Sequence, residues 1–245
     1  MAIKAPESVS FNSTAFCPGC GHGIVGRLIG EVMEEMGLTE KLLVVVDVAC
    51  SSLHVDSWRF DNITAAHGRP IATATGVKKI RKDNPVLAYL GDGAAYSIGI
   101  AETMHAAIRN DNVVTIVINN QVFGMTGGQM SSTSLEGQKT ATSPKGRNTA
   151  STGQPFDAMK VLGQMDVAYL ARGAVASPAD IRKTKQYIKK AFEKHMNNEG
   201  FAFIEILSPC PTNLHLTPIQ CSERTNTIVK EYFKVGEYID KGADK

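Results

Sequence analysis

Along most of the chain, short and almost continuously apolar runs alternate with longer stretches of helical periodicity. Continuous apolar character is typical of parallel strands covered on both faces, so we predict strands in the runs and helices between them. The alternation predicts a single α/β domain over residues 1–245, built on one doubly wound, mostly parallel sheet. The predicted strands are residues 42–47, 86–90, 113–118, 167–170 and 201–207, and the predicted helices are residues 24–36, 98–109 and 179–195.

Two segments lack this pattern. Residues 124–154 are rich in Gly, Ser, Thr and Gln and have no apolar period. A loop of this length inside a compact domain is usually functional or disordered. Residues 234–245 are polar, and we predict a tail that frays.

The composition excludes several classes of protein. A net charge of +2 is too small to imply a nucleic acid or a membrane as partner. The longest apolar runs are far shorter than the roughly 18 residues of a transmembrane helix. The N-terminal residues lack the apolar core of a secretory signal, which favours a cytoplasmic location. Five cysteines in such a chain indicate metal or redox chemistry instead of structural disulfides.

A polar motif follows the predicted strand 86–90. The strand runs directly into Gly91-Asp92-Gly93, which places Asp92 at the carboxyl end of a parallel strand, where open α/β sheets bind ligands. The two glycines let the backbone approach a ligand closely, and the helix that follows presents its N-terminus to an anion. The motif therefore predicts a site for an anionic ligand.

The next predicted strand brings a second oxygen donor to the same edge, because it ends in Asn119-Asn120. Asp92, the Asn120 side chain and the Val122 carbonyl suit Mg²⁺, which prefers oxygen ligands and phosphate oxygens. Taken alone, each motif is also typical of a simple turn or strand cap. Together, with 25 residues between Gly93 and Asn119, they resemble the signature of thiamine-diphosphate enzymes. No P-loop motif is present in the sequence.

Four cysteines lie where strands or helices are predicted to begin or end. Cys17 and Cys20 form a Cys-x-x-Cys pair before a helix, whereas Cys50 and Cys210 follow strands. Four thiolates suit a [4Fe–4S] cluster or tetrahedral zinc. Spacing alone also leaves open a redox-active pair or unrelated buried thiols.

Several ordered motifs resemble those of the β subunit of 2-oxoacid:ferredoxin oxidoreductases, in the branch that acts on branched-chain 2-oxo acids or 2-oxoglutarate. The match runs from about residue 11 to residue 215. The resemblance implies a thiamine-diphosphate-binding fold of the diphosphate-binding type, with thiamine diphosphate, Mg²⁺ and a [4Fe–4S] cluster as cofactors. The motifs are Cys17-Pro-Gly-Cys20-Gly-His22-Gly, Asp47-Val-Ala-Cys50-Ser-Ser, His67-Gly-Arg69-Pro-Ile-Ala-Thr-Ala-Thr-Gly76, Gly91-Asp-Gly93 and Gly124-Met-Thr-Gly-Gly-Gln129.

The family pattern also implies roles for individual residues. Cys221 lies outside the matching Ser-Pro-Cys motif and competes with Cys210 for the fourth cluster position. His22 is expected to pack or hydrogen-bond at the start of its helix and not to bind metal. The implied cluster ligands are Cys17, Cys20, Cys50 and Cys210, and the implied cofactor-binding residues are Cys50, Ser51, His67, Gly91, Asp92, Gly93, Asn120 and Thr126.

The reaction implied by the resemblance is oxidative decarboxylation of a 2-oxo acid to acyl-CoA and CO₂, with electrons passing through the cluster to ferredoxin. Some relatives carry Lys at the position of Gly127, so its absence favours an apolar substrate such as 3-methyl-2-oxobutanoate over 2-oxoglutarate or pyruvate. A cluster-free thiamine-diphosphate decarboxylase or synthase subunit is the alternative, followed by a non-catalytic carrier of the cofactor.

One catalytic group is missing from this assignment. Thiamine-diphosphate chemistry needs a carboxylate beside the aminopyrimidine ring, and we interpret Glu102, in a helix, and Glu136, in the long loop, as solvated or structural. The activating glutamate is therefore expected from a partner α subunit that supplies the pyrimidine-binding domain. The family also implies γ and ferredoxin-like δ subunits, with ferredoxin and coenzyme A as further partners.

A competing motif, Gly21-His22-Gly23-Ile24-Val25-Gly26, formally fits the dinucleotide fingerprint G-x-G-x-x-G. Asp47 lies about 20 residues further on, where that fingerprint has its ribose-binding acid. The fingerprint requires a buried strand directly before the first glycine, and Cys-Pro-Gly-Cys occupies that place. The sequence therefore disfavours nicotinamide binding.

Overall fold

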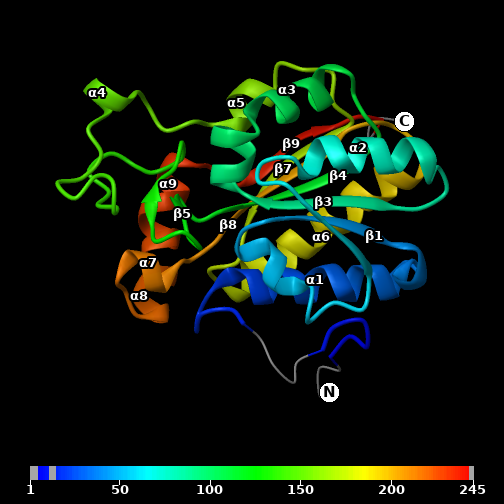
Figure 1. Ribbon diagram of the computed structural model, residues 1–245, viewed down its shortest axis with the longest axis horizontal. Helices are drawn as coiled ribbons and strands as arrows, with labels where there is room; N and C mark the ends of the chain where they lie inside the picture. The colour runs from blue at the N-terminus through cyan, green and yellow to red at the C-terminus, as the bar shows by residue number, and fades with distance from the viewer. Residues whose placement is uncertain (1–4, 11–14, 243–245) are drawn as a thin grey trace.

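The computed structural model describes residues 5–10 and 15–242. In this part of the chain, one seven-stranded sheet has the order β2-β1-β3-β4-β8-β7-β9 (Figure 1). The first six strands of this order run parallel, and β9 pairs antiparallel to β7. The predicted doubly wound, mostly parallel sheet is confirmed. The strands are β1 (Leu43–Asp47), β2 (Asp61–Ala65), β3 (Val86–Gly91), β4 (Val114–Asn119), β7 (Tyr169–Ala174), β8 (Ala202–Leu207) and β9 (Gly236–Asp240).

The five predicted strands form the middle of the sheet, because their side chains are apolar on both faces and are buried there. The edge strands β2 and β9 are not predicted from the sequence. Both are largely polar and partly exposed, which hides the apolar signal of a strand. The prediction of a fraying tail over residues 234–245 is wrong for Gly236–Asp240, which pair with β7. Residues 243–245 lie outside the described part.

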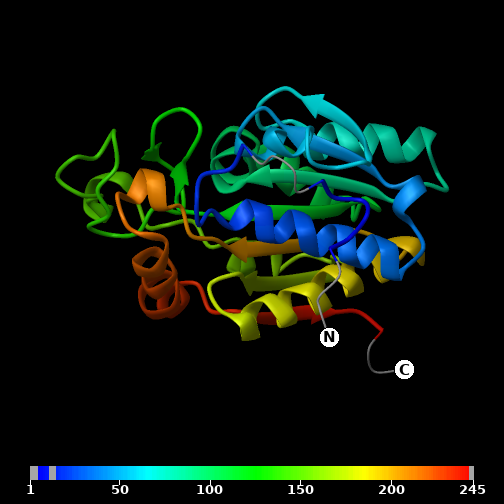
Figure 2. The same cartoon turned by 90° about the horizontal axis from the view of Figure 1, so that it is seen from below.

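Helices cover both faces of the sheet (Figures 1 and 2). Helices α1 (Gly21–Glu35) and α6 (Pro178–Met196) pack on one face, where Val44, Val46 and Tyr89 belong to the core. Alternate residues of the same strands, such as Val45 and Ala88, face the core beneath α2, α3 and α5. Within the described ranges, no helix is both long and apolar enough to span a membrane. The bounds of the second layer are α2 (Pro70–Ile80), α3 (Ile100–Ile108) and α5 (Ala158–Leu162).

Two differences from the predicted helices have local causes. Helix α2 is missed because its sequence, Pro-Ile-Ala-Thr-Ala-Thr-Gly-Val, is rich in residues with low helix propensity. The helix predicted from residue 98 begins at Ile100, since the preceding Ala94–Ile98 forms a single turn of π-helix (η3). Such turns are frequent at functional sites, and this one follows directly after Gly91-Asp92-Gly93.

The long loop is ordered and extends beyond the carboxyl ends of the strands (Figure 1). It begins with the short hairpin of β5 (Val122–Phe123) and β6 (Gln129–Met130) and includes α4 (Thr149–Thr152). The buried Arg147 side chain donates hydrogen bonds to several backbone carbonyls of this loop. The C-terminal segment lies beside it, with α7 (Pro211–Leu214), α8 (Pro218–Arg224), the π-turn η4 (Thr225–Val229) and α9 (Lys230–Tyr232).

Candidate cofactor site at the carboxyl ends of the strands

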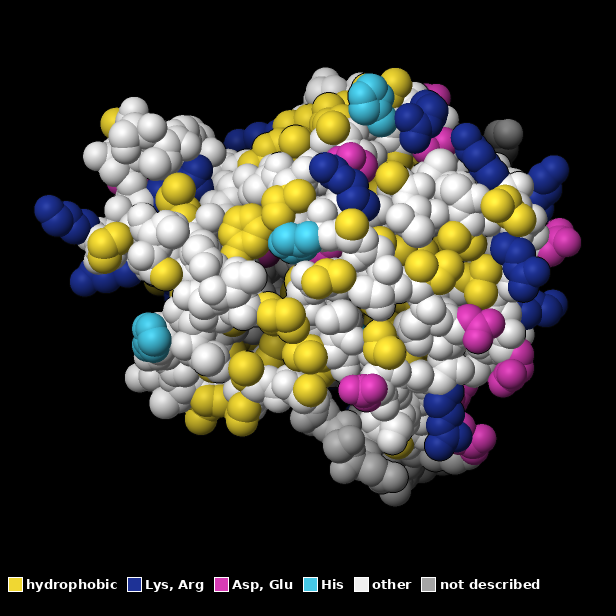
Figure 3. Space-filling model, viewed as in Figure 1, with side chains coloured by type: hydrophobic (Ala, Val, Ile, Leu, Met, Phe, Trp, Pro, Cys, Tyr) yellow, Lys and Arg dark blue, Asp and Glu magenta, His cyan; other side chains and the backbone are white. Residues whose placement is uncertain are grey.

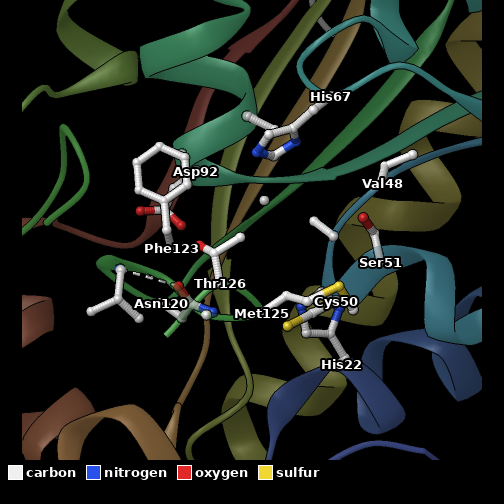
Figure 4. A pocket seen from close by; sticks show the side chains of 16 residues that line it. His22, Val48, Cys50, Ser51, His67, Asp92, Asn120, Phe123, Met125 and Thr126 are labelled. Carbon is white, nitrogen blue, oxygen red and sulfur yellow. Dashed lines mark hydrogen bonds between the residues drawn. The ribbon is translucent and has the colours of Figure 1, made fainter. Parts of the chain in front are cut away.

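A pocket opens where β1, β3 and β4 end, and it encloses about 430 Å³ of space, part of it open to solvent (Figure 4). Every residue that the sequence predicts to contact the cofactor lies in the lining of this pocket. These are Cys50, Ser51, His67, Gly91, Asp92, Gly93, Asn120 and Thr126, with Val122 beside them.

Asp92 is the acidic residue at the bottom of this pocket, and its side chain is 1% exposed. One carboxylate oxygen, Oδ2, accepts a 2.7 Å hydrogen bond from the Ser131 hydroxyl and a second hydrogen bond from the Thr133 hydroxyl. Burial raises the pKa of Asp92 to about 6; the two hydroxyl groups oppose this rise, and the nearby Glu205 adds to it. The carboxylate is therefore costly to ionise when it is alone, and a divalent cation would offset that cost.

The chain turns sharply after β4. Gln121 has a φ of +63°, an uncommon conformation for a residue other than glycine. Its carbonyl accepts hydrogen bonds from the Ser134 hydroxyl, at 2.6 Å, and the Gln138 amide, at 2.9 Å. The turn lets the Asn120 side chain accept a 3.2 Å hydrogen bond from the Val122 backbone N–H, which brings two predicted Mg²⁺ ligands together.

At two glycines, the lack of a Cβ atom lets a neighbouring side chain pack directly against the backbone. A Cβ atom at Gly93 would lie 2.5 Å from the Phe123 ring, and one at Gly124 would lie 3.2 Å from the Cys50 sulfur. The first separation is impossible without movement of the ring. At Gly91, by contrast, a Cβ atom would meet no atom nearer than 3.9 Å, so the backbone there leaves room for close binding of a diphosphate group. The residues present fit a Mg²⁺-diphosphate group.

The four cysteines predicted to bind a cluster lie near one another at the edge of this pocket. Burial raises the pKa of Cys20 to about 12, and the thiols of Cys210, Cys50 and Cys17 add to the rise. Burial also raises the pKa of Cys50 to about 11, with Cys210 and Cys17 contributing. Among the described residues, however, no group of three or more His, Cys, Asp or Glu side chains is arranged to hold a metal ion.

Two polar side chains, those of Asn213 and His22, lie beside this group of thiols. Asn213 donates hydrogen bonds to the Gly124 carbonyl, at 3.0 Å, and to the Cys210 sulfur, at 3.5 Å. His22 behaves as expected, because its Nδ1 forms a 2.8 Å hydrogen bond with the Tyr89 hydroxyl and its ring stacks on Phe16. Burial lowers the pKa of His22 to about 4, so its ring is neutral at physiological pH.

Glu102 and Glu136 serve the local structure. Glu102 Oε1 forms a 2.5 Å ion pair with Arg69, and Glu136 accepts a 2.7 Å hydrogen bond from the Thr149 backbone N–H. Neither glutamate lines the pocket. Cys221 lies in α8, and burial raises the pKa of its thiol, while the guanidinium of Arg224 opposes the rise.

Sequence reasoning missed several residues at the site. Asp47 ends β1 at the same sheet edge as Asp92, and its place at a strand end could have marked it. Ser131 and Thr133 lie in the loop without an apolar period, and no sequence signal connects them with Asp92. The dinucleotide alternative fails, because residues 15–20 form no strand before α1 and both Asp47 carboxylate oxygens bond to residues of this chain, His67 and Gly68.

The family model of the thiamine pyrophosphate enzyme C-terminal TPP-binding domain matches residues 47–206. Ketoisovalerate oxidoreductase subunit VorA of Methanothermobacter thermautotrophicus is 38% identical over 237 residues, which are 95% of this chain and 49% of that protein. The chain thus spans about half the length of this relative. The 2-oxoglutarate synthase subunit KorB of Methanocaldococcus jannaschii is 38% identical over 198 residues, which are 80% of this chain and 69% of that protein.

A solved structure gives the same assignment. The 2-oxoglutarate:ferredoxin oxidoreductase from Magnetococcus marinus, with 2-oxoglutarate, coenzyme A and succinyl-CoA bound, superposes with a TM-score of 0.74 at 28% identity. The superposition covers 86% of this chain and 70% of that one. The family model and these relatives each extend over most of the described sheet. The chain therefore belongs to the 2-oxoacid:ferredoxin oxidoreductase family, among the subunits that carry the TPP-binding domain of thiamine pyrophosphate enzymes.

Proposed function

We propose that this chain, as one domain over residues 1–245, is the thiamine-diphosphate-binding subunit of an enzyme that oxidatively decarboxylates a 2-oxo acid to acyl-CoA and CO₂. One observation carries the proposal. Asp92, Asn120 and His67 line a single pocket at the carboxyl ends of neighbouring strands, within the residues that match a TPP-binding domain. Each turnover would release one proton and two electrons.

Different residues of the pocket would bind the Mg²⁺ ion and the diphosphate group of the cofactor. Asp92, the Asn120 side chain and the Val122 carbonyl would bind Mg²⁺. His67 and Thr126 would contact the diphosphate together with the backbone of Gly91 and Gly93. Bound thiamine diphosphate would supply the electron sink that allows CO₂ to leave a 2-oxo acid. The buried carboxylate and the sharp turn at Gln121 support this assignment, because both preorganise oxygen ligands before the metal arrives.

Cys17, Cys20, Cys50 and Cys210 would hold a [4Fe–4S] cluster that passes electrons to ferredoxin. Cys50 also lines the pocket, so the cluster would lie beside the cofactor. The proximity of the thiols supports this assignment, because Cys210, Cys50 and Cys17 each raise the pKa of Cys20, and Cys210 and Cys17 raise that of Cys50.

The glutamate that activates the cofactor would come from a partner α subunit. Asp92 is the acidic residue in the pocket lining of the described chain, and its position suits metal binding. Glu102 and Glu136 bond elsewhere, as described above. The γ subunit and the ferredoxin-like δ subunit, coenzyme A and ferredoxin would complete the reaction.

The substrate is proposed to be 3-methyl-2-oxobutanoate. The described pocket lining contains no Lys or Arg, which would pair with the second carboxylate of 2-oxoglutarate. Instead, the lining includes the apolar side chains of Val48, Met125 and Phe123, of which the first two are exposed (Figure 4). Figure 3 shows hydrophobic side chains gathered over this part of the molecule, with most Lys and Arg side chains near the periphery. Pyruvate and 2-oxoglutarate remain the competing substrates.

The test is an anaerobic assay of the native complex with coenzyme A, ferredoxin and each 2-oxo acid in turn. We expect kcat/KM to be highest for 3-methyl-2-oxobutanoate, and Asp92→Asn to abolish both turnover and Mg²⁺-dependent binding of thiamine diphosphate. Asp166→Asn, a change at a carboxylate whose side chain is 93% exposed, is the matched control. Full turnover by Asp92→Asn would overturn the proposed site, and a higher kcat/KM with 2-oxoglutarate would overturn the proposed substrate.

A further inference from the structure

The buried Asp47 and the partly exposed His67 form a pair beside the pocket. Asp47 Oδ2 lies 2.6 Å from His67 Nδ1, and Asp47 Oδ1 accepts a 2.8 Å hydrogen bond from the Gly68 backbone N–H. The Asp47 side chain is 0% exposed. Gly68 adopts a φ of +78°, a conformation that favours glycine and that turns its N–H toward the end of β1. Both oxygens of the carboxylate are thus used to fix one short segment.

This pairing determines how His67 faces the pocket. When the Asp47 carboxylate is ionised it only accepts hydrogen bonds, and Nδ1 of His67 then carries a hydrogen and donates it to Asp47. The other ring nitrogen, Nε2, has no hydrogen-bond partner within the described residues, and the side chain is 30% exposed at the pocket wall (Figure 4). The Phe123 ring lies edge-to-face at 6.1 Å between centroids and limits rotation of the imidazole.

The pocket has few other sources of positive charge. None of the described residues that line it is Lys or Arg, and the neutral His22 already shares Nδ1 with the Tyr89 hydroxyl. A diphosphate group carries more negative charge than one Mg²⁺ ion neutralises. A histidine whose Nδ1 is committed to a carboxylate can contact a phosphate oxygen through Nε2 only when Nε2 also carries a hydrogen. Asp47 and bound diphosphate would together favour that cationic ring.

We propose that Asp47 is a positioning residue that holds His67 with Nδ1 turned inward and Nε2 turned to the pocket, so that the imidazole serves as the cationic contact of the cofactor's diphosphate. The inference rests on the proposed function, since it concerns the same cofactor. Asp47 thus does more than end strand β1, because it orients the ring of His67. This role also explains why this apolar strand ends in a fully buried carboxylate.

The first test requires no variant. In the native complex without added cofactor, ¹⁵N NMR of the histidine rings should show Nδ1 of His67 protonated. On addition of Mg²⁺ and thiamine diphosphate, both ring nitrogens of His67 should be protonated. A ring with hydrogen on Nε2 alone, or one that does not respond to bound cofactor, would overturn the inference.

The second test is a double-mutant cycle in the dissociation constant for thiamine diphosphate with Mg²⁺, measured by calorimetry on the native complex. In Asp47→Asn, the new oxygen can accept from Gly68 and the new amide would donate to Nδ1, which reverses the hydrogen pattern of the ring. We expect affinity to fall by on the order of tenfold or more, because Nε2 would then donate from a neutral ring that has lost its positive charge. His67→Gln should show a similar loss.

The double variant decides whether Asp47 acts through His67. If it does, Asp47→Asn should change the affinity by less than about twofold when His67 is already Gln. Equal losses in both backgrounds, or no loss in either, would overturn the inference. Asp166→Asn controls for charge at an exposed carboxylate. Failure of the unmodified complex to bind thiamine diphosphate would instead overturn the proposed function, so the two failures are distinguishable.

Discussion

Asp92, in the turn after β3, accepts a 2.7 Å hydrogen bond from the hydroxyl group of Ser131, which lies 39 residues further along the chain. Thr133 donates to the same carboxylate oxygen. The long loop therefore completes the surroundings of the carboxylate that we propose to bind Mg²⁺. Because Arg147 holds the backbone of this loop, the electrostatics of Asp92 depend on residues far from it in sequence.

Removing both hydroxyl groups should weaken the site. In Ser131→Ala/Thr133→Val, the Asp92 carboxylate loses two donors, so its pKa should rise further above about 6 and its ionised fraction should fall at neutral pH. Hydrogen bonds to charged groups contribute about 1.5–3 kcal/mol, so we expect affinity for Mg²⁺-thiamine diphosphate to fall about tenfold or more. Calorimetry should show a smaller deficit at pH 8 than at pH 6.5. Ser151→Ala, in the exposed α4, is the control.

Arg147→Met should loosen the loop without unfolding the sheet. The guanidinium donates to the carbonyls of Ser132, at 3.0 Å, Ser134, at 2.6 Å, and Gly153, at 2.9 Å, and Met keeps the apolar length of the side chain but no donor. We expect faster amide hydrogen exchange over residues 131–154 and unchanged exchange in β3 and β4. Lys145→Met, at an exposed position of the same loop, should leave exchange unaltered. Equal exchange in both variants would contradict the role given to Arg147.

The two buried C-terminal cysteines allow a matched comparison. Cys210→Ser should lower the iron and sulfide content of the anaerobically purified complex and its visible absorption, because a proposed ligand is lost. Cys221→Ser removes another buried thiol, in α8, and should leave iron content at the unmodified level. The opposite pattern would assign the fourth ligand to Cys221, and iron-free protein in every case would remove the cluster from the proposal.

Arg172→Met should destabilise the fold strongly. The Arg172 side chain is 1% exposed, donates to the fully buried Glu205, and pairs with Asp157 at 2.6 Å. Its removal leaves Glu205 buried without its cation, which typically costs about 3–5 kcal/mol of unfolding free energy. Urea unfolding should show this loss, whereas Arg182→Met on the exposed face of α6 should change the free energy by less than about 0.5 kcal/mol. A loss below about 1 kcal/mol would contradict the prediction.

His195 should make the fold sensitive to acid. Burial lowers its pKa to about 3, and Nε2 accepts a 3.0 Å hydrogen bond from the Val86 backbone N–H, so the folded state holds the ring neutral. The unfolded ring has a pKa of about 6.5. Its contribution is therefore fully present above pH 6.5 and is lost as pH falls toward 3, by about 2 kcal/mol between pH 7 and pH 5. His195→Gln should flatten the stability curve over this range, whereas His105→Gln, at an exposed position, should not.

The sequence predicts the middle of the sheet and the positions of the pocket residues well, for a definite reason. The five inner strands are buried on both faces, so their apolar runs are continuous, and the carboxyl ends of parallel strands must meet at one edge. This rule alone brings Asp92 and Asn120 together. The edge strands have no continuous apolar run and are therefore not predicted. In β9, for example, Glu237 and Asp240 form ion pairs with Lys190.

The sequence by itself determined the α/β alternation, the strand-end motif and the resemblance to a family, because each depends on local periodicity or short spacing. Only the tertiary structure decided which groups complete the site. The pairing of Asp47 with His67, and of Asp92 with Ser131 and Thr133, connects residues about 20 to 40 positions apart through polar contacts that have no period. Such contacts form only after the packed sheet has fixed the places where its loops begin and end.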